Sequence, residues 1–235
     1  MLKPVSNHHI ISGVSVASED SLYHKLLEDI ASGTLKSGDR LVTTSIAEQH
    51  GTSINPVREA LKRLEGEGFV TFKKNSGARV ARFEYQTMKN AFELLQLLEP
   101  YLLSWFVENA SSANIEDLKQ TLREMKNLSV DDSYRFRTLD TEFHWQMYSS
   151  HYNADAVSLW RRKKHILQAL HVGLSISPKR IKDAITEHEL LLNCIEQGDV
   201  DGALLALRSH LDQGGEYWSN SFPMALERVQ GSHQV

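Results

Sequence analysis

The segment from Leu41 to Val80 constrains the fold more than any other part of this sequence. Its pattern predicts a short helix over about 44–50, a tight turn at Gly51, and a second helix that begins after Ser53, a residue type that can cap a helix. A hairpin follows over about 69–81, with β-branched and aromatic residues in its first strand and a glycine at its tip. This order of elements is that of a winged helix-turn-helix, whose second helix lies in the major groove of DNA.

The second predicted helix has one apolar side and one polar, basic side. Pro56 falls in its first turn, where a missing N–H does little harm. The apolar residues recur at helical spacing and form a stripe that we expect to be buried: Val57, Ala60, Leu61 and Leu64. A solvated surface helix is the alternative interpretation, but it leaves the preceding helix and the basic hairpin unexplained. The sequence therefore predicts a DNA-binding module.

Nine residues of this module are candidates for DNA contact. Those on the outer side of the second helix and in the hairpin are expected to reach base edges (Asn55, Arg58), phosphates (Lys62, Lys74, Arg79) and the minor groove (Ser76, Gly77). Two more, Thr44 and Ser53, lie near the starts of the two helices. The whole chain has a net charge of −4, yet residues 54–82 hold seven basic and three acidic residues. A basic patch confined to one small module favours phosphate contact there.

Residues from about Ser21 to Ala81 resemble the N-terminal domain of GntR-type bacterial transcription regulators. The run from Pro56 to Gly68, PVREALKRLEGEG, is similar to the most typical segment of that family. One position departs from the pattern, because relatives often have arginine where this chain has Ile54. The resemblance implies that this protein reads a different base step there, or relies more on Asn55 and Arg58.

The rest of the chain reads as helix, in six segments separated by turn residues. The expected segments are 87–110, 115–128, 133–150, 154–174, 178–197 and 200–219. Helices of this length with short connections favour an antiparallel bundle. The fold class is thus mainly α, with these domains: a tail over 1–18, the winged module over 19–82, a linker over 83–86, the helical domain over 87–222 and a second tail over 223–235.

The cysteine count and the distribution of apolar residues indicate the cellular compartment of the protein. Cys194 is the single cysteine, so no disulfide forms within the chain, and an inert buried thiol is expected. The sequence shows neither the apolar run of a signal peptide nor a stretch long enough to span a bilayer. We therefore expect a cytoplasmic protein without membrane contact.

Eleven histidines are present, and three of them, with one aspartate, form a candidate metal site. Asp140 and His144 are four residues apart on one predicted helix, so both side chains leave the same face. His188 and His210 lie on two later amphipathic helices, and a bundle can bring all three helices around one point. The residues alone leave two interpretations open. The four side chains could form a metal site, or the histidines could be core residues whose hydrogen bonds are satisfied within the protein.

The region from about Thr87 to Trp218 resembles the FCD domain, the helical C-terminal domain of GntR-type regulators of the FadR branch. The similar segments are LDTEFH at 139–144, EHELL at 187–191 and RSHL at 208–211. The resemblance implies that Asp140, His144, His188 and His210 hold a divalent metal at the base of an effector pocket. Such a ligand set suits Zn²⁺ or Ni²⁺, and an organic or sugar acid could reach the open positions of the ion.

One departure concerns the first bundle helix. Relatives commonly have an arginine there that is replaced by Leu95 or Gln96 in this chain. A pocket without that arginine is less suited to a small dicarboxylate. Substitutes are available on other helices, where solvated charges are the ordinary expectation: Arg135, Arg137, Arg161 and Arg162.

The expected function is a ligand-responsive regulator, more often a repressor in such relatives, that binds a palindromic double-stranded operator as a homodimer. The alternative is a metal-dependent hydrolase with an appended winged helix. The metalloprotease pattern HExxH fails, because His188-Glu189 is followed by Leu192 where the second histidine would stand. The sequence also has no GxSxG, P-loop or dinucleotide fingerprint, so we expect no catalytic residues.

Overall fold

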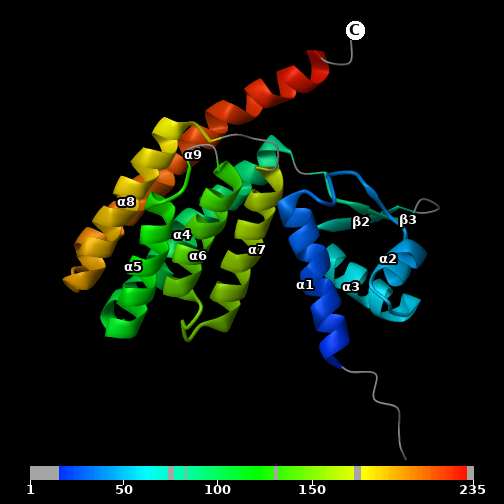
Figure 1. Ribbon diagram of the computed structural model, residues 1–235, viewed down its shortest axis with the longest axis horizontal. Coiled ribbons are helices and arrows are strands. Elements are labelled where there is room, and N and C mark those ends of the chain that lie inside the picture. Colours follow the sequence, from blue (N-terminus) through cyan, green and yellow to red (C-terminus); the bar gives the residue numbers. More distant parts are fainter. Residues whose placement is uncertain (1–15, 74–76, 83, 130–131, 172–175, 232–235) are drawn as a thin grey trace, which may run out of the picture. The chain divides into compact units, whose positions relative to one another are not determined.

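The computed structural model describes residues 16–73, 77–82, 84–129, 132–171 and 176–231 (Figure 1). The chain divides into two compact units, and each is described by itself. The first consists of the residues up to Ile30 together with 38–81, and the second consists of 31–37 and the residues from Arg82 onward. Among the described helices, none combines the length and the apolar character that crossing a membrane requires.

The first unit is a winged helix-turn-helix. Its elements are α1 (Val16–Ser32), β1 (Arg40–Leu41), α2 (Thr43–Gln49), α3 (Ile54–Gly66), β2 (Val70–Lys73) and β3 (Gly77–Val80). The three strands form an antiparallel sheet in the order β1-β3-β2, with Phe72 paired to Ala78 in the hairpin. The prediction of α2, α3 and the hairpin is confirmed. Strand β1 was not predicted, because two residues are too few to show an alternating pattern.

The core of this unit lies on the apolar side of α3. The stripe predicted from the sequence is buried, with Val57, Leu61 and Leu64 fully enclosed. Gly51 (φ +60°) forms the turn between α2 and α3 in the left-handed region that favours glycine. Ser53 occupies the N-cap position of α3, but the predicted side-chain cap is wrong, since its hydroxyl makes no cap hydrogen bond. Pro56 stands at the third helical position and has no N–H, so it removes one of the two backbone donors that such a cap can use.

The second unit is a bundle of six described helices. They are α4 (Tyr85–Asn109), α5 (Ser112–Lys126), α6 (Ser133–Tyr148), α7 (Ala154–Leu170), α8 (Pro178–Glu196) and α9 (Val200–Gly231). α4 packs against α7 and α9, and α8 packs against α5 and α9. Several helices begin at capping side chains that accept a backbone N–H bond, as Asn153 does from Ala156.

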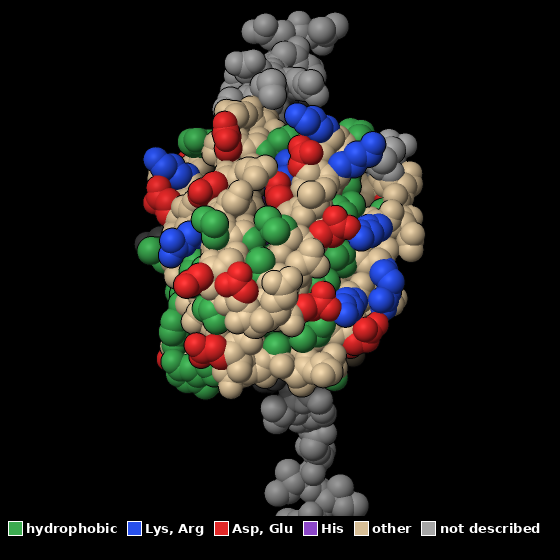
Figure 2. All heavy atoms as spheres, turned by 90° about the vertical axis from the view of Figure 1, so that its left-hand side faces the viewer, with side chains coloured by type: hydrophobic (Ala, Val, Ile, Leu, Met, Phe, Trp, Pro, Cys, Tyr) green, Lys and Arg blue, Asp and Glu red, His purple; other side chains and the backbone are tan. Residues whose placement is uncertain are grey.

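The helix bounds differ from expectation mainly at two ends. α9 continues to Gly231, although the sequence pattern was expected to end near Ser219. The described part of α7 ends at Leu170, and residues 172–175, which fell in the predicted helix, lie outside the described residues. On the face of the bundle shown in Figure 2, acidic and basic side chains are intermixed. Ion pairs such as Lys119–Glu196 and Lys126–Glu189 join α5 to α8.

Candidate functional site

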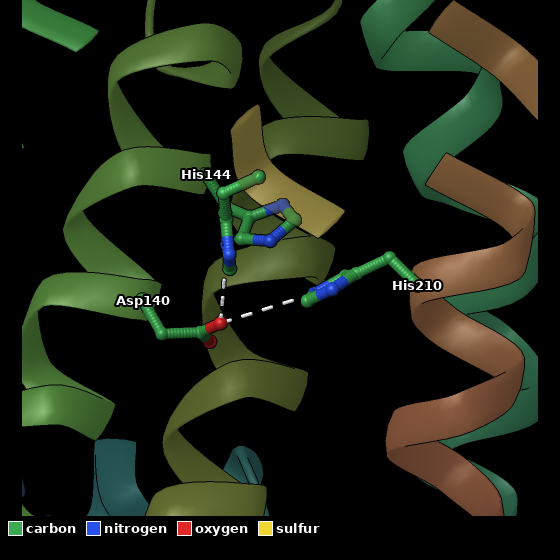
Figure 3. Close-up of side chains that lie close together, drawn as sticks. Asp140, His144 and His210 are labelled. Atoms are coloured by element: carbon green, nitrogen blue, oxygen red, sulfur yellow. Dashed lines mark ion pairs between the residues drawn. The ribbon is translucent and has the colours of Figure 1, made fainter. Parts of the chain in front are cut away.

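The bundle brings the four predicted metal ligands together. Asp140 and His144 project from α6, His188 from α8 and His210 from α9. One ligand atom from each residue lies within 4.8 Å of the other three. Figure 3 shows Asp140, His144 and His210 pointing toward one another from their helices. Residues that are far apart in the sequence thus form one compact cluster.

Each imidazole is oriented by a hydrogen bond at its Nδ1 atom. The Nδ1 of His144 lies 3.1 Å from Oε2 of Glu99. The Nδ1 of His188 lies 2.7 Å from the Ala184 carbonyl oxygen, and that of His210 lies 2.7 Å from Oε2 of Glu187. Because all three partners are acceptors, each Nδ1 carries the proton, and each Nε2 keeps a free lone pair.

The Nε2 atoms of His188 and His210 face the carboxylate of Asp140. In His144 and His188 this nitrogen is buried and has no hydrogen-bond partner among the residues that the structure describes. The Nε2 atoms of His188 and His210 lie 3.4 and 3.8 Å from Oδ1 of Asp140. An unpartnered buried nitrogen is costly, whereas three imidazole lone pairs and one carboxylate form a donor set that first-row divalent ions accept. The residues present therefore fit a metal ion.

Glu99 is the main support of His144. Its side chain is fully buried, and Oε2 also accepts the Tyr148 hydroxyl at 3.1 Å while Oε1 accepts the Trp160 indole N–H at 3.0 Å. Burial alone would raise the pKa of Glu99, but the adjacent His144 and the charge of Lys164 outweigh it and lower the pKa to about 2. Glu99 is therefore ionised at neutral pH and holds the proton of His144 on Nδ1.

Two cations balance the other carboxylates of the site. Nζ of Lys164 lies 3.3 Å from Oδ2 of Asp140. Burial would raise the pKa of Asp140, but Lys164 helps to keep it well below its ordinary value. Arg180 binds Glu187 through two hydrogen bonds of 2.7 and 2.9 Å. The pKa of Glu187 falls to about 2 although burial opposes this, because His210 and Arg180 hydrogen-bond to its carboxylate.

The neutral imidazole is favoured at His210. Burial lowers the pKa of His210 to about 4, although the hydrogen bond to Glu187 opposes this, and His188 and His144 nearby act in the same direction as burial. A neutral imidazole is the form that binds a metal.

A cavity opens beside the cluster, with Asp140 and His210 in its wall and a volume of about 90 Å³. Leu95 lines it and is buried, whereas Gln96 is exposed and donates to Asp212 at 2.8 Å. Leu95 is thus the residue that faces the cavity from the first bundle helix. Of the four arginines proposed as substitutes, Arg137 is a lining residue.

Sequence reasoning missed Glu99, Lys164, Tyr148 and His171 as members of the site. Glu99 offered a clue, because it is an acid within the buried stripe of α4, four residues after Leu95. His171 also lines the cavity, and Lys164 approaches the site from α7. In the sequence, neither His171 nor Lys164 has a metal-binding residue three or four positions away. Only the packing of α7 on α4 and α6 shows that both belong to the site.

The DNA-facing candidates of the first unit are mostly exposed. Asn55, Arg58 and Lys62 lie on the exposed side of α3, opposite the buried stripe. Lys62 pairs with Glu59 at 2.9 Å, a surface pair that binding to a phosphate can replace at little cost. The other exposed candidates that the structure describes are Thr44, Ser53 and Gly77. Lys74 and Ser76 lie outside the described residues.

Arg79 has a structural partner that the sequence did not indicate. It is half-buried on β3 and donates through Nη1 to the Gly38 carbonyl oxygen at 3.0 Å. This bond ties the wing to the segment before β1. That Arg79 contacts a phosphate stays a prediction. The other N–H donors of its guanidinium could make this contact.

Two family models match the chain. The model described as "Bacterial regulatory proteins, gntR family" covers residues 19–80, and the model described as "FCD domain" covers residues 90–213. The HTH-type transcriptional regulator LutR of Bacillus subtilis is 25% identical over 214 residues, which span 82% of this chain and 97% of that protein. The gluconate operon transcriptional repressor of the same organism is 25% identical over 207 residues, or 86% of this chain and 82% of that protein.

The fold has solved counterparts as well. The structure of E. coli McbR/YncC aligns with a TM-score of 0.77 at 22% sequence identity, covering 85% of this chain and 96% of that chain. At this level of identity the likeness concerns the fold alone.

Proposed function

We propose that this chain, which belongs to the gntR family of bacterial regulatory proteins and has an FCD domain, is a homodimeric repressor that responds to a small carboxylate. It is a DNA-binding transcription regulator by family. Beyond the family, we propose a dimer, a palindromic operator, a bound metal and a carboxylate effector for this chain. The family is one of regulators, and this favours regulation over the hydrolase alternative.

One observation supports operator binding most directly. α3 buries its apolar stripe and leaves Asn55 and Arg58 exposed on the other side. Among the described residues neither side chain has a hydrogen bond or an ion pair, so both are available to DNA. Arg58 would bind a guanine edge, Asn55 would reach an adjacent base or the backbone, and Lys62 would neutralise a phosphate. Two such modules related by a two-fold axis would read two half-sites.

The helical domain would serve as the sensor. Asp140, His144, His188 and His210 would hold Zn²⁺ or Ni²⁺, and when bound the ion would supply positive charge and an open position to an effector carboxylate. Lys164 and Arg137 at the cavity wall would assist by attracting the anion. A relative is named the repressor of a gluconate operon, which supports repression relieved by an organic or sugar acid. The effector would shift the population of conformers that binds DNA.

A gel-shift titration of an operator fragment tests the DNA-binding part of this proposal. Arg58→Ala should weaken specific binding by about 1–3 kcal/mol if Arg58 makes a bidentate base contact. Lys89→Ala is the matched control, because Lys89 is an exposed cation of the helical unit, and this variant should titrate as the wild type does. An unchanged curve for Arg58→Ala would remove Arg58 from the reading face.

A further inference from the structure

Arg180 and Glu187 form an ion pair on one side of α8. The two residues are seven positions apart, which is about two helical turns, so both side chains leave the same side of the helix. Nη1 of Arg180 donates to Oε1 of Glu187 at 2.7 Å, and Nη2 donates to Oε2 at 2.9 Å. Both side chains are only 12% exposed. Two parallel hydrogen bonds fix the orientation of the carboxylate, which a single hydrogen bond would leave free to rotate.

The carboxylate of Glu187 connects this pair to the proposed metal site. Nδ1 of His210, on α9, donates to the same Oε2 atom at 2.7 Å. The other ring nitrogen of His210, Nε2, lies 3.8 Å from Oδ1 of Asp140. Because Arg180 contacts both oxygens of Glu187, the carboxylate cannot turn away from His210 without breaking the bidentate contact. A continuous chain of hydrogen bonds therefore leads from Arg180 through Glu187 to His210.

The guanidinium of Arg180 is held between two helices. The backbone N–H of Arg180 donates at 3.2 Å to Oγ of Ser177, the N-cap residue of α8. On α9, a Cβ atom built at Gly214 would lie 4.0 Å from Nη2 of Arg180, so the guanidinium lies next to that helix. Lysine has one compact ammonium group in place of the planar guanidinium and cannot make the same bidentate contact with Glu187. Arg180→Lys therefore removes the bidentate contact and keeps the charge.

The other two imidazoles of the cluster are oriented independently of this chain. Their Nδ1 atoms contact Glu99 and the carbonyl oxygen of Ala184. Neither contact involves Arg180. An effect of Arg180 on the orientation of the ligands therefore has to pass through His210.

Two other interpretations of the ion pair make different predictions. If the pair only stabilises the fold, its loss lowers the unfolding temperature and leaves the metal affinity of the folded protein unchanged. If Arg180 acts on the metal ion only through its charge, its loss strengthens metal binding, because a nearby cation repels a divalent ion. In that case lysine would also replace arginine without effect. A weaker affinity is expected only if Arg180 orients a ligand.

We propose that Arg180 is a positioning residue of the metal site, which fixes the carboxylate of Glu187 and thereby directs Nε2 of His210 toward the ion. A cation thus favours the binding of another cation, because the orientation of the ligand outweighs the repulsion between the two charges. This inference rests on the proposed function, since it concerns the metal that the four candidate ligands are proposed to hold.

Competition between the full chain and a chromophoric chelator for Zn²⁺ tests the inference. Arg180→Lys should lower the affinity by about tenfold, the lower end of the range typical of groups that orient a ligating histidine. Arg180→Gln should cause a similar loss, since it also lacks the bidentate contact. Arg123→Lys is the matched control, because Arg123 pairs with Glu116 over the same spacing on α5, where these side chains are 52% and 61% exposed. This control should stay within about twofold of the wild type.

Two further measurements separate positioning from a structural role. In a Glu187→Gln background, Arg180→Lys should change the Zn²⁺ affinity by less than about twofold, because the carboxylate through which Arg180 acts is gone. The visible absorption of bound Co²⁺ depends on the number and geometry of its ligands. It should change in Arg180→Lys and stay as in the wild type in Arg123→Lys.

The results that would overturn the inference are distinct from those that would overturn the proposed metal site. An unchanged or raised Zn²⁺ affinity in both Arg180→Lys and Arg180→Gln would reject positioning and leave the metal site in place. A full loss of affinity on adding Arg180→Lys to the Glu187→Gln background would show that Arg180 does not act through Glu187. If the wild type itself binds no Zn²⁺, the proposed metal site fails and the inference fails with it.

Discussion

Replacing Glu99 by glutamine tests how the proposed metal cluster is built. The carboxylate accepts three buried hydrogen bonds, from His144 and Tyr148 at Oε2 and from Trp160 at Oε1. Glutamine keeps the shape but turns one of these oxygens into a donor. If the amide oxygen stays toward Trp160, the amide N–H₂ meets the N–H of His144. The proton of His144 must then move from Nδ1 to Nε2, the atom that faces the metal site.

The alternative orientation of the amide is no better. With its oxygen toward His144, the N–H₂ group meets the indole N–H of Trp160, and two buried donors face each other. In either orientation two buried N–H donors face each other without an acceptor, at a cost of about 1–3 kcal/mol. In the first orientation His144 avoids this by moving its proton to Nε2, which removes the lone pair that would bind the metal and so weakens metal binding. We therefore expect Glu99→Gln to lower metal affinity by roughly 10- to 100-fold, the range typical of groups that orient a ligating histidine.

Competition between the protein and a chromophoric chelator for Zn²⁺ measures this affinity. Glu108→Gln is the matched control, because it makes the same charge change on an exposed position of α4 and should leave the affinity unchanged. A Glu99→Gln protein that binds Zn²⁺ within about twofold of the wild type would refute the reasoning. His144 would then not depend on Glu99 for its tautomer.

Three other predictions concern the metal, the cavity and the winged module. His188→Ala should lose bound metal and unfold at a lower temperature, and elemental analysis showing full occupancy would remove His188 from the ligand set. The pKa of His171 is held well below its ordinary value by burial and by Arg137 and Lys164. The unfolded chain therefore binds more protons below pH of about 6.5, and stability falls as the pH drops. In the presence of a chelator, the wild type should therefore lose more stability than His171→Phe as the pH falls below about 6.5, measured by denaturant unfolding, and an equal loss in the two proteins would contradict this. Leu61→Ala should destabilise the winged module by about 2–5 kcal/mol in urea unfolding, because this side chain is fully enclosed, and a loss under about 1 kcal/mol would contradict the packing.

The sequence predicted those parts of the fold that local patterns encode. The stripe Val57-Ala60-Leu61-Leu64 gave α3 and its buried side, and the turn residues separated the six bundle helices. The spacing of Asp140 and His144 placed two candidate ligands on one face, but the expectation that His188 and His210 join them needed a family resemblance. Packing among distant helices is what sets that meeting point, and spacing along one helix does not encode it. The bond from Arg79 to Gly38 also joins distant parts of the chain and so escaped prediction, whereas strand β1 is too short to show an alternating pattern.

The two oxygens of Asp140 have different surroundings, and this resolves an apparent conflict at the site. A lysine beside a metal ligand would ordinarily compete with the ion for the carboxylate. Here Lys164 lies 3.3 Å from Oδ2, while His188 and His210 face Oδ1. The pKa of Lys164 is raised although burial opposes this, because Asp140 and Glu99 favour its charged form. Lys164 can therefore stabilise the ionised carboxylate through one oxygen and leave the other free to bind the ion. The same ammonium lines the cavity, so an incoming carboxylate would meet a charge that is already in place and would not have to displace it from the metal ligand.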